Sequence, residues 1–119
     1  MLVEKKLTKK QIKKLEKRRI KKLFIEWTER VKLRDSHMCV ICKSTEYIHT
    51  HHLIVREFKP LRFDIDNGVC LCAKHHKFSL ENSPHRNPLV FVMWLLENRP
   101  AQTHRLYDKY NESKTVITL

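Results

Sequence analysis

Three cysteines and a histidine have the types and spacing that bind a metal. Cys39 and Cys42 form a C-x-x-C knuckle, and Cys72 and His75 form a C-x-x-H knuckle of matching spacing. Zinc prefers four thiolate or imidazole ligands in a tetrahedron, and each knuckle presents two ligands from one tight turn. We therefore predict a closed structural zinc site on these four residues, with buried reduced thiols and no metal as the alternative. Cys70 lacks a matching partner and is predicted to be a small buried core residue.

Histidines and an asparagine form a second group, interlaced with the two knuckles. His51 and His52 lie between the knuckles, Asn67 follows His52 by 15 residues, and His76 follows Asn67 by nine. Histidine, with an ordinary pKa of about 6.5, can take a proton from water near neutral pH. Neighbouring residues of a strand point to opposite faces, so one histidine can bind a cation while the other faces water. Phosphodiester hydrolysis requires such a base and a cation on the phosphoryl group.

The segment from Arg34 to about His85 resembles HNH endonucleases of the ββα-metal type, especially the small zinc-bearing kind common in phage genomes. The resemblance rests on C-x-x-C at 39–42, H-H-L-I at 51–54 and N-G-V-C-L-C-x-x-H-H at 67–76. It covers roughly fifty residues, under half of the chain. The ordered set of motifs at these intervals is far more specific than a pair of adjacent histidines.

The resemblance implies a role for each residue of the second group. His51 would be the first ligand of a catalytic divalent cation such as Mg²⁺ or Mn²⁺, and His76 the second, from the helix that begins at the zinc knuckle. His52 would be the general base that activates water. Asn67 would hydrogen-bond the backbone near His52 and hold the loop so that the imidazole points at the phosphate.

The chain departs from the family pattern at a few positions. Many relatives have a cysteine where His75 stands, and histidine remains a suitable zinc ligand. Some relatives have a further ligand one helical turn after the last one, where this chain has Leu80. His85 is a disfavoured third ligand because it follows Pro84 and lies outside the expected helix. His49 is predicted to be a strand or turn residue rather than a ligand.

The positive charge of the chain is concentrated near its N-terminus. The 119 residues include 25 Lys and Arg and 13 Asp and Glu. Residues 1–34 contain 14 of the Lys and Arg residues and 4 of the Asp and Glu residues, which gives this segment a net charge of +10. Because this segment lacks Gly and Pro, we predict one helix from about Lys9 to Leu33, capped by Thr8. Apolar residues recur at steps of three and four in its second half, which is expected to pack on the core.

A projecting basic helix is typical of a segment that binds nucleic-acid phosphates, because neutralised phosphates release counterions. A solvated helix without a partner is the alternative. The residues predicted to contact nucleic acid are Lys13, Lys14, Lys17, Arg18, Lys21, Arg56 and Lys77.

The remaining elements predict an α+β fold. We predict two strands, Ile48 to Val55 and Val69 to Leu71, with the turn Asp66-Asn67-Gly68 directly before the second strand. A short helix is predicted over residues 72–80. Helices are expected over 87–98 and 101–110, followed by a tail of β-like composition at 115–119. The fold class is thus a ββα-metal finger with structural zinc knuckles (35–86), flanked by a basic N-terminal helix (1–34) and C-terminal helices (87–119). These parts are expected to form one compact domain.

The sequence favours a metal-dependent DNA endonuclease of the cytoplasm, with a non-catalytic zinc-containing nucleic-acid-binding module as the alternative. The longest apolar run, Leu89 to Leu96, is far below the ~20 residues of a membrane helix, so no membrane partner is expected. The N-terminus lacks the apolar stretch of a secretory signal. The expected cofactors are Zn²⁺ and a catalytic divalent cation. DNA is the expected partner, with a homodimer or a larger phage or mobile-element complex as further possibilities.

Overall fold

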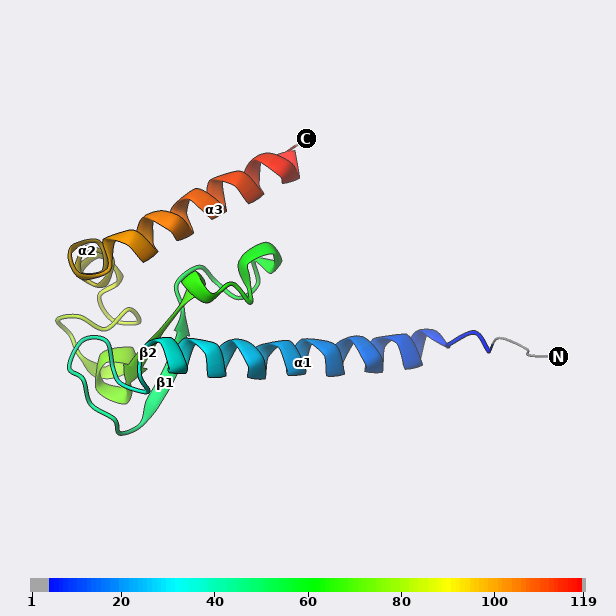
Figure 1. Cartoon of the computed structure of the whole chain (residues 1–119), viewed down its shortest axis with the longest axis horizontal. Helices are drawn as coiled ribbons and strands as arrows, with labels where there is room; N and C mark the ends of the chain where they lie inside the picture. Colours follow the sequence, from blue (N-terminus) through cyan, green and yellow to red (C-terminus); the bar gives the residue numbers. More distant parts are fainter. Residues whose placement is uncertain (1–4, 119) are drawn as a thin grey trace.

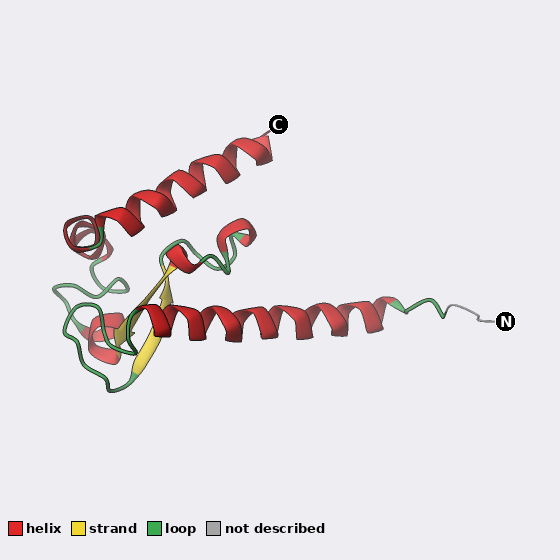
Figure 2. Ribbon diagram, in the orientation of Figure 1, coloured by secondary structure: helices red, strands yellow, loops and turns green. Residues whose placement is uncertain are grey.

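A computed structural model describes residues 5–118, and in residues 115–118 the backbone alone. Over these residues the protein combines three α-helices with one small antiparallel sheet of two strands (Figures 1 and 2). The main elements are α1 (Lys9–Arg34), β1 (Ile48–His52), β2 (Gly68–Cys72), α2 (Pro88–Asn98) and α3 (Pro100–Thr118). The α+β class is therefore confirmed in this coarse form.

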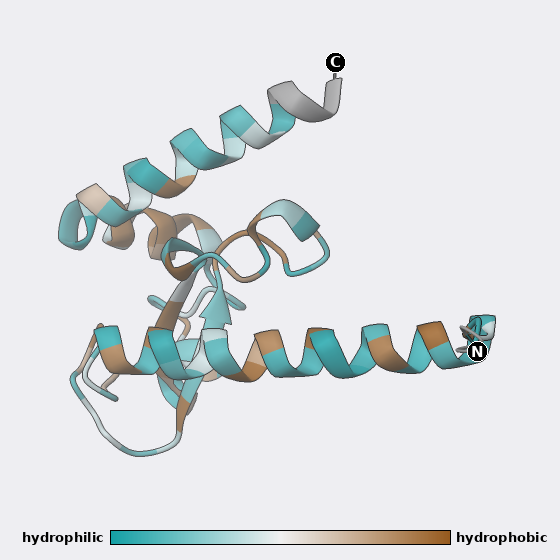
Figure 3. Ribbon diagram, turned by 45° about the vertical axis from the view of Figure 1, so that its right-hand side comes forward, coloured by the Kyte–Doolittle hydropathy of each residue, from teal (hydrophilic) through white to brown (hydrophobic). Residues whose placement is uncertain are grey.

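Helix α1 begins where the sequence predicts and extends one residue beyond the predicted end. The Gln11 backbone N–H donates to the Thr8 hydroxyl over 3.1 Å, and the Gln11 side chain accepts from the Thr8 backbone N–H over 2.8 Å. This capping box satisfies two amides of the first turn. Only Trp27 and Val31 of α1 are buried, so the N-terminal half projects from the sheet as a mostly hydrophilic rod (Figures 1 and 3).

Strand β1 is shorter than the sequence predicts, because it ends at His52 rather than Val55. The Asn67 side chain accepts from the Ile54 backbone N–H and donates to the Ile54 carbonyl, which takes these groups out of a strand ladder. In the sheet His51 pairs with Val69 and His52 with Gly68.

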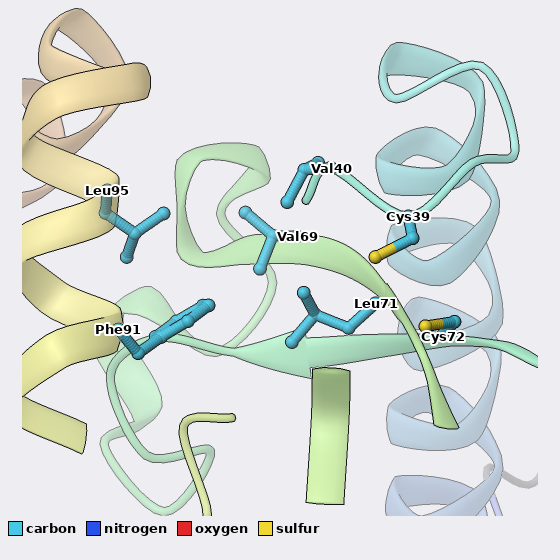
Figure 4. Close-up of a cluster of buried hydrophobic side chains, with 7 residues drawn as sticks. All are labelled: Cys39, Val40, Val69, Leu71, Cys72, Phe91 and Leu95. Carbon is cyan, nitrogen blue, oxygen red and sulfur yellow. The ribbon is translucent and has the colours of Figure 1, made fainter. Parts of the chain in front are cut away.

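The two faces of β2 pack on different helices, which makes all five of its residues buried. Val69 and Leu71 lie in a cluster with Phe91 and Leu95 of α2 (Figure 4). Cys70 faces the other way and packs against Trp27 and Val31 of α1. The prediction that Cys70 is a small core residue is confirmed, and burial raises the pKa of its thiol to about 11.

Buried Asp35, the residue after α1, joins three parts of the fold. Its carboxylate accepts hydrogen bonds from Arg34, from Arg99 before α3, and from the Cys70 backbone N–H of β2, each at 2.9 Å. Burial opposes ionisation of this carboxyl, but the hydrogen bonds from Arg34, Cys70 and Arg99 outweigh it and hold its pKa below the ordinary value. The network fixes the end of α1 against the sheet.

Two further sequence predictions need correction. The helix expected over 72–80 is a single wide turn, Lys74–Phe78, closed by a 2.7 Å hydrogen bond from the Ser79 N–H to the Lys74 carbonyl. Helix α3 continues to Thr118 instead of ending near Tyr110, so the part of the predicted β-like tail that the structure describes is helical. Within residues 5–118, no helix combines the length and apolar character needed to cross a membrane.

Candidate metal centres and catalytic site

The two cysteine-containing knuckles meet at one point and form a group that could hold a structural metal such as zinc. The ligand atoms of Cys39, Cys42, Cys72 and His75 all lie within 4.8 Å of one another. Cys42 Sγ is 3.7 Å from Cys72 Sγ, and Cys39 Sγ is 3.6 Å from His75 Nδ1. A tetrahedral zinc ion separates two sulfurs by about 3.8 Å and a sulfur from a nitrogen by about 3.6 Å, so the donor set and its spacing fit zinc.

The knuckle backbone favours the thiolate that a metal needs. Burial opposes ionisation of Cys39, but the backbone N–H groups of Cys42, Cys72 and Ile41 point at its sulfur and lower the pKa of the thiol. Burial raises the pKa of Cys72, where the neighbouring thiols add to the effect. A bound cation would supply the charge that stabilises both thiolates.

Three histidines form a second group with ligand geometry. Ligand nitrogens of His51, His76 and His85 also lie within 4.8 Å of one another, and His76 Nε2 is 3.0 Å from His85 Nε2. His51 comes from β1, His76 from the wide turn and His85 from the loop before α2. Burial, followed by the neighbouring histidines, lowers the pKa of His51 to about 3 and that of His76 to about 4. Both rings are therefore neutral near pH 7, the form that binds a cation.

The place of His85 differs from the sequence-based expectation. The buried hydroxyl of Ser83 donates to the His76 carbonyl over 2.7 Å, which folds the loop back over the wide turn. The turn-forming residues Asn82-Ser83-Pro84 indicate that the chain changes direction here, but they do not specify that His85 returns to His76. Leu80, whose apolar side chain cannot bind a metal, is exposed.

His52 points to the other side of β1 and is held by two contacts. Its Nε2–H donates to the Arg62 carbonyl over 2.8 Å, and its ring stacks on Trp27 with centroids 4.0 Å apart and planes 10° apart. Because a carbonyl can only accept, Nε2 carries the hydrogen and Nδ1 is left as the proton acceptor. Burial lowers the pKa of His52, and the Arg56 and Arg62 cations add to this, while the hydrogen bond to the carbonyl opposes it. Sequence reasoning did not identify Trp27 or Arg62 as positioning residues.

Asn67 fixes the loop that positions His52. Its side chain is fully buried and makes three hydrogen bonds: it accepts from Ile54 N–H (2.6 Å) and donates to the carbonyls of Ile54 (3.0 Å) and Leu61 (2.9 Å). Ile54 follows His52 by two positions, and Leu61 directly precedes Arg62, whose carbonyl accepts the hydrogen bond from His52. These are backbone contacts of the kind that the family resemblance implies for Asn67.

The histidines converge on one shallow pocket of about 380 Å³. His51, His52, His76 and His85 line this pocket together with Phe24, and Arg56 and Lys77 contribute its cationic groups. Of the other predicted nucleic-acid contacts, Lys17 and Lys21 lie in an adjoining pocket with Arg56. The remainder, Lys13, Lys14 and Arg18, are exposed in the N-terminal half of α1.

Comparison with models of protein families, with curated proteins and with solved structures finds no match to this chain. The function must therefore be argued from the geometry and chemistry of its two metal-ligating groups and the residues around them.

Proposed function

We propose that this chain is a zinc-stabilised HNH endonuclease that hydrolyses phosphodiester bonds of DNA with the help of a divalent cation. The observation that supports this most strongly is the pocket that His52 shares with His51, His76 and His85. In this pocket a histidine whose hydrogen bond fixes its tautomer lies beside three imidazoles that could hold a cation. This is the combination that hydrolysis of an anionic ester needs.

In the proposed reaction, Nδ1 of His52 takes a proton from water as the water oxygen bonds to phosphorus. The bond from phosphorus to the 3′-oxygen breaks, solvent protonates that oxygen, and the products are a 5′-phosphate and a 3′-hydroxyl. The Arg62 carbonyl and the Trp27 ring keep His52 oriented during the proton transfer. A divalent cation on His51, His76 and His85 would stabilise the charge of the scissile phosphate and of the leaving oxygen. Three imidazoles favour ions such as Ni²⁺ over Mg²⁺.

The structural zinc has a positioning role in this proposal. Cys72 ends β2 and His75 lies in the wide turn, directly before His76. A metal held by both residues would fix the turn against the sheet and thereby set the distance from His76 to His51 on β1. Loss of zinc is expected to abolish cleavage through this geometry.

The basic α1 helix would supply affinity that does not depend on DNA sequence. Removal of one cation that neutralises a phosphate should reduce the slope of log K against log salt by about 0.9. Changing Lys13, Lys14 and Arg18 to Gln is thus expected to flatten the slope, whereas Lys43→Gln beside the zinc knuckle should leave it unchanged. A slope that stays the same in the triple variant would refute the role of α1.

A plasmid-nicking assay tests the proposed function. Zinc-loaded protein is incubated with supercoiled DNA and Mg²⁺, Mn²⁺ or Ni²⁺, and wild type is compared with His52→Ala and with His104→Ala, a matched change at an exposed histidine on α3. Loss of the general base should slow nicking by about 10²–10⁴-fold, whereas His104→Ala should cut like wild type. Nicking that persists in His52→Ala would refute the assignment of the base.

If the protein binds DNA but does not cut it with any of these three metals, it would instead be a non-catalytic zinc-containing nucleic-acid-binding module. This alternative is favoured by the charge of α1 alone and does not require the histidine pocket.

A further inference from the structure

A second pocket, of about 640 Å³, adjoins the histidine pocket along the side of α1. The two pockets share Phe24, Arg56 and Glu57, so they lie next to each other, and we refer to the pair as the groove. The proposed nuclease chemistry uses only the histidine end of this groove. The other end lies between α1 and the loop that carries Arg62 and Phe63.

Part of the lining of the second pocket is apolar and aromatic. Phe24 is 37% exposed, and Ile20 and Ile25 of α1 lie beside it in the pocket lining. Phe63 lines the pocket and also packs against the buried cluster of Trp27, Val31 and Cys70, so it has a rigid support. Phe24, Trp27 and His52 form a cluster of three rings, with centroids 5.7 Å apart for Phe24 and Trp27, 4.0 Å for Trp27 and His52, and 6.1 Å for Phe24 and His52.

The same pocket is also lined by cationic side chains. Lys17 and Lys21 of α1 face Arg56 and Arg62 of the loop, against one carboxylate, Glu57, which lies 3.9 Å from Arg56. The Arg62 Nε–H donates to the Arg56 carbonyl over 2.7 Å, and its guanidinium lies 5.9 Å from the Phe63 ring centroid. An apolar ligand would leave these cations desolvated, and a purely ionic ligand would leave the rings uncovered. A nucleotide satisfies both, with its base on the rings and its phosphates on the cations.

We propose that this pocket holds an unpaired base of the DNA strand whose phosphodiester lies in the histidine pocket. A base inside a duplex is stacked and paired, so it must leave the helix to reach Phe24 and Phe63. Single-stranded or branched DNA, or DNA with a flap, is therefore the preferred substrate over intact duplex. The inference rests on the proposed function, because the base is assigned to the DNA strand whose phosphodiester is cleaved in the histidine pocket.

Binding of labelled oligonucleotides tests the base pocket without any cleavage. The probes are an oligothymidylate of about ten nucleotides and an abasic strand of equal length and equal charge. Zinc-loaded protein without added divalent cation is titrated into each probe, and affinity is read from fluorescence anisotropy. Because one stacked base is worth about five- to 150-fold in affinity, oligothymidylate should bind tighter by that factor. Equal affinity for both probes, or no binding to either, would overturn the proposal.

Variants test whether the tighter binding of oligothymidylate over the abasic strand arises in this pocket. Phe24→Ala should bring the ratio of the two affinities close to one, while Leu15→Ala, a matched change at an exposed apolar residue of α1 outside the pocket, should keep the wild-type ratio. Phe63→Leu keeps apolar packing but removes the ring, and should lower the ratio as well. Lys17→Ala should weaken both probes alike. Circular dichroism and zinc content establish that each variant is folded, and an unchanged ratio in folded Phe24→Ala and Phe63→Leu would refute the pocket.

The two proposals fail in different ways. Absence of plasmid nicking with a preserved preference for bases would remove the nuclease function and leave an adaptor for unpaired DNA. Nicking of duplex DNA without any base preference would keep the nuclease and remove the base pocket. An oligouridylate of equal length shows whether the pocket distinguishes DNA from RNA; tighter binding of the RNA strand would overturn the choice of DNA.

Discussion

Gly68, the only glycine of the chain, occupies the closest approach between β2 and α1. Its φ of −156° is ordinary extended backbone, so the position requires glycine for space and not for conformation. A Cβ at this position would lie 2.5 Å from Trp27 Cζ2 and 2.9 Å from Val31 Cγ2. Carbon atoms pack at about 3.5–4.0 Å, so Gly68→Ala must push the indole ring away by roughly 1 Å.

The Trp27 ring has little freedom to retreat. Its Nε1–H donates to the Asp64 carbonyl over 2.8 Å, and its ring stacks on His52. Overpacking of this kind costs about 1–3 kcal/mol, and the stiffer unfolded chain returns about 0.4–1 kcal/mol. We expect a net loss of about 1–2 kcal/mol. With an unfolding entropy of about 0.25 kcal/mol/K for this length, the melting temperature should fall by roughly 4–8 °C.

Thermal melts of zinc-loaded protein measure this loss, and a double-mutant cycle locates it. Trp27→Phe removes the ring atoms that the new methyl group meets. The loss of unfolding free energy in the double variant should therefore be smaller, by about 1 kcal/mol, than the sum of the losses in the two single variants. The NMR resonances of the His52 ring should shift in Gly68→Ala, while those of exposed His104 stay in place. An unchanged melting temperature, or strictly additive losses, would refute the close packing of Trp27 on β2.

Three other outcomes are expected. Cys42→Ala should lower the zinc content and unfold the knuckles, because structural zinc contributes about 10–16 kcal/mol of binding free energy in comparable sites. Cys70→Ala is the control and should keep one zinc per chain. Equal zinc content in both variants would contradict the ligand set. The pKa of Asp35 is lowered by folding, so its contribution to stability is present above about pH 4 and is lost as the pH falls through the folded-state pKa. Urea midpoints against pH should therefore fall less steeply in acid for Asp35→Asn than for wild type, and parallel curves would exclude this linkage. Asn67→Ala should cost about 2–4 kcal/mol in urea unfolding because it breaks three hydrogen bonds of a buried side chain, and a loss below 1 kcal/mol would show that the loop holds without it.

The sequence predicts the features that depend on short spacing. Two ligands three residues apart must share one turn, so the zinc knuckles could be identified from Cys39, Cys42, Cys72 and His75 alone. The extent of α1 follows from its helix-forming residues and from the cap at Thr8. The ββα-metal arrangement and the roles of the histidines stay predictions that rest on the resemblance to HNH endonucleases.

The tertiary structure decided the partners of each histidine. Trp27 stacks on His52 because α1 crosses β2 at Gly68, a contact between residues far apart in the sequence. The Arg62 carbonyl and the return of His85 likewise depend on how loops fold back on the sheet. Spacing along a chain determines which neighbours share a turn or a face. Contacts between distant segments arise only when buried surfaces pack together, and no local pattern in the residues encodes them.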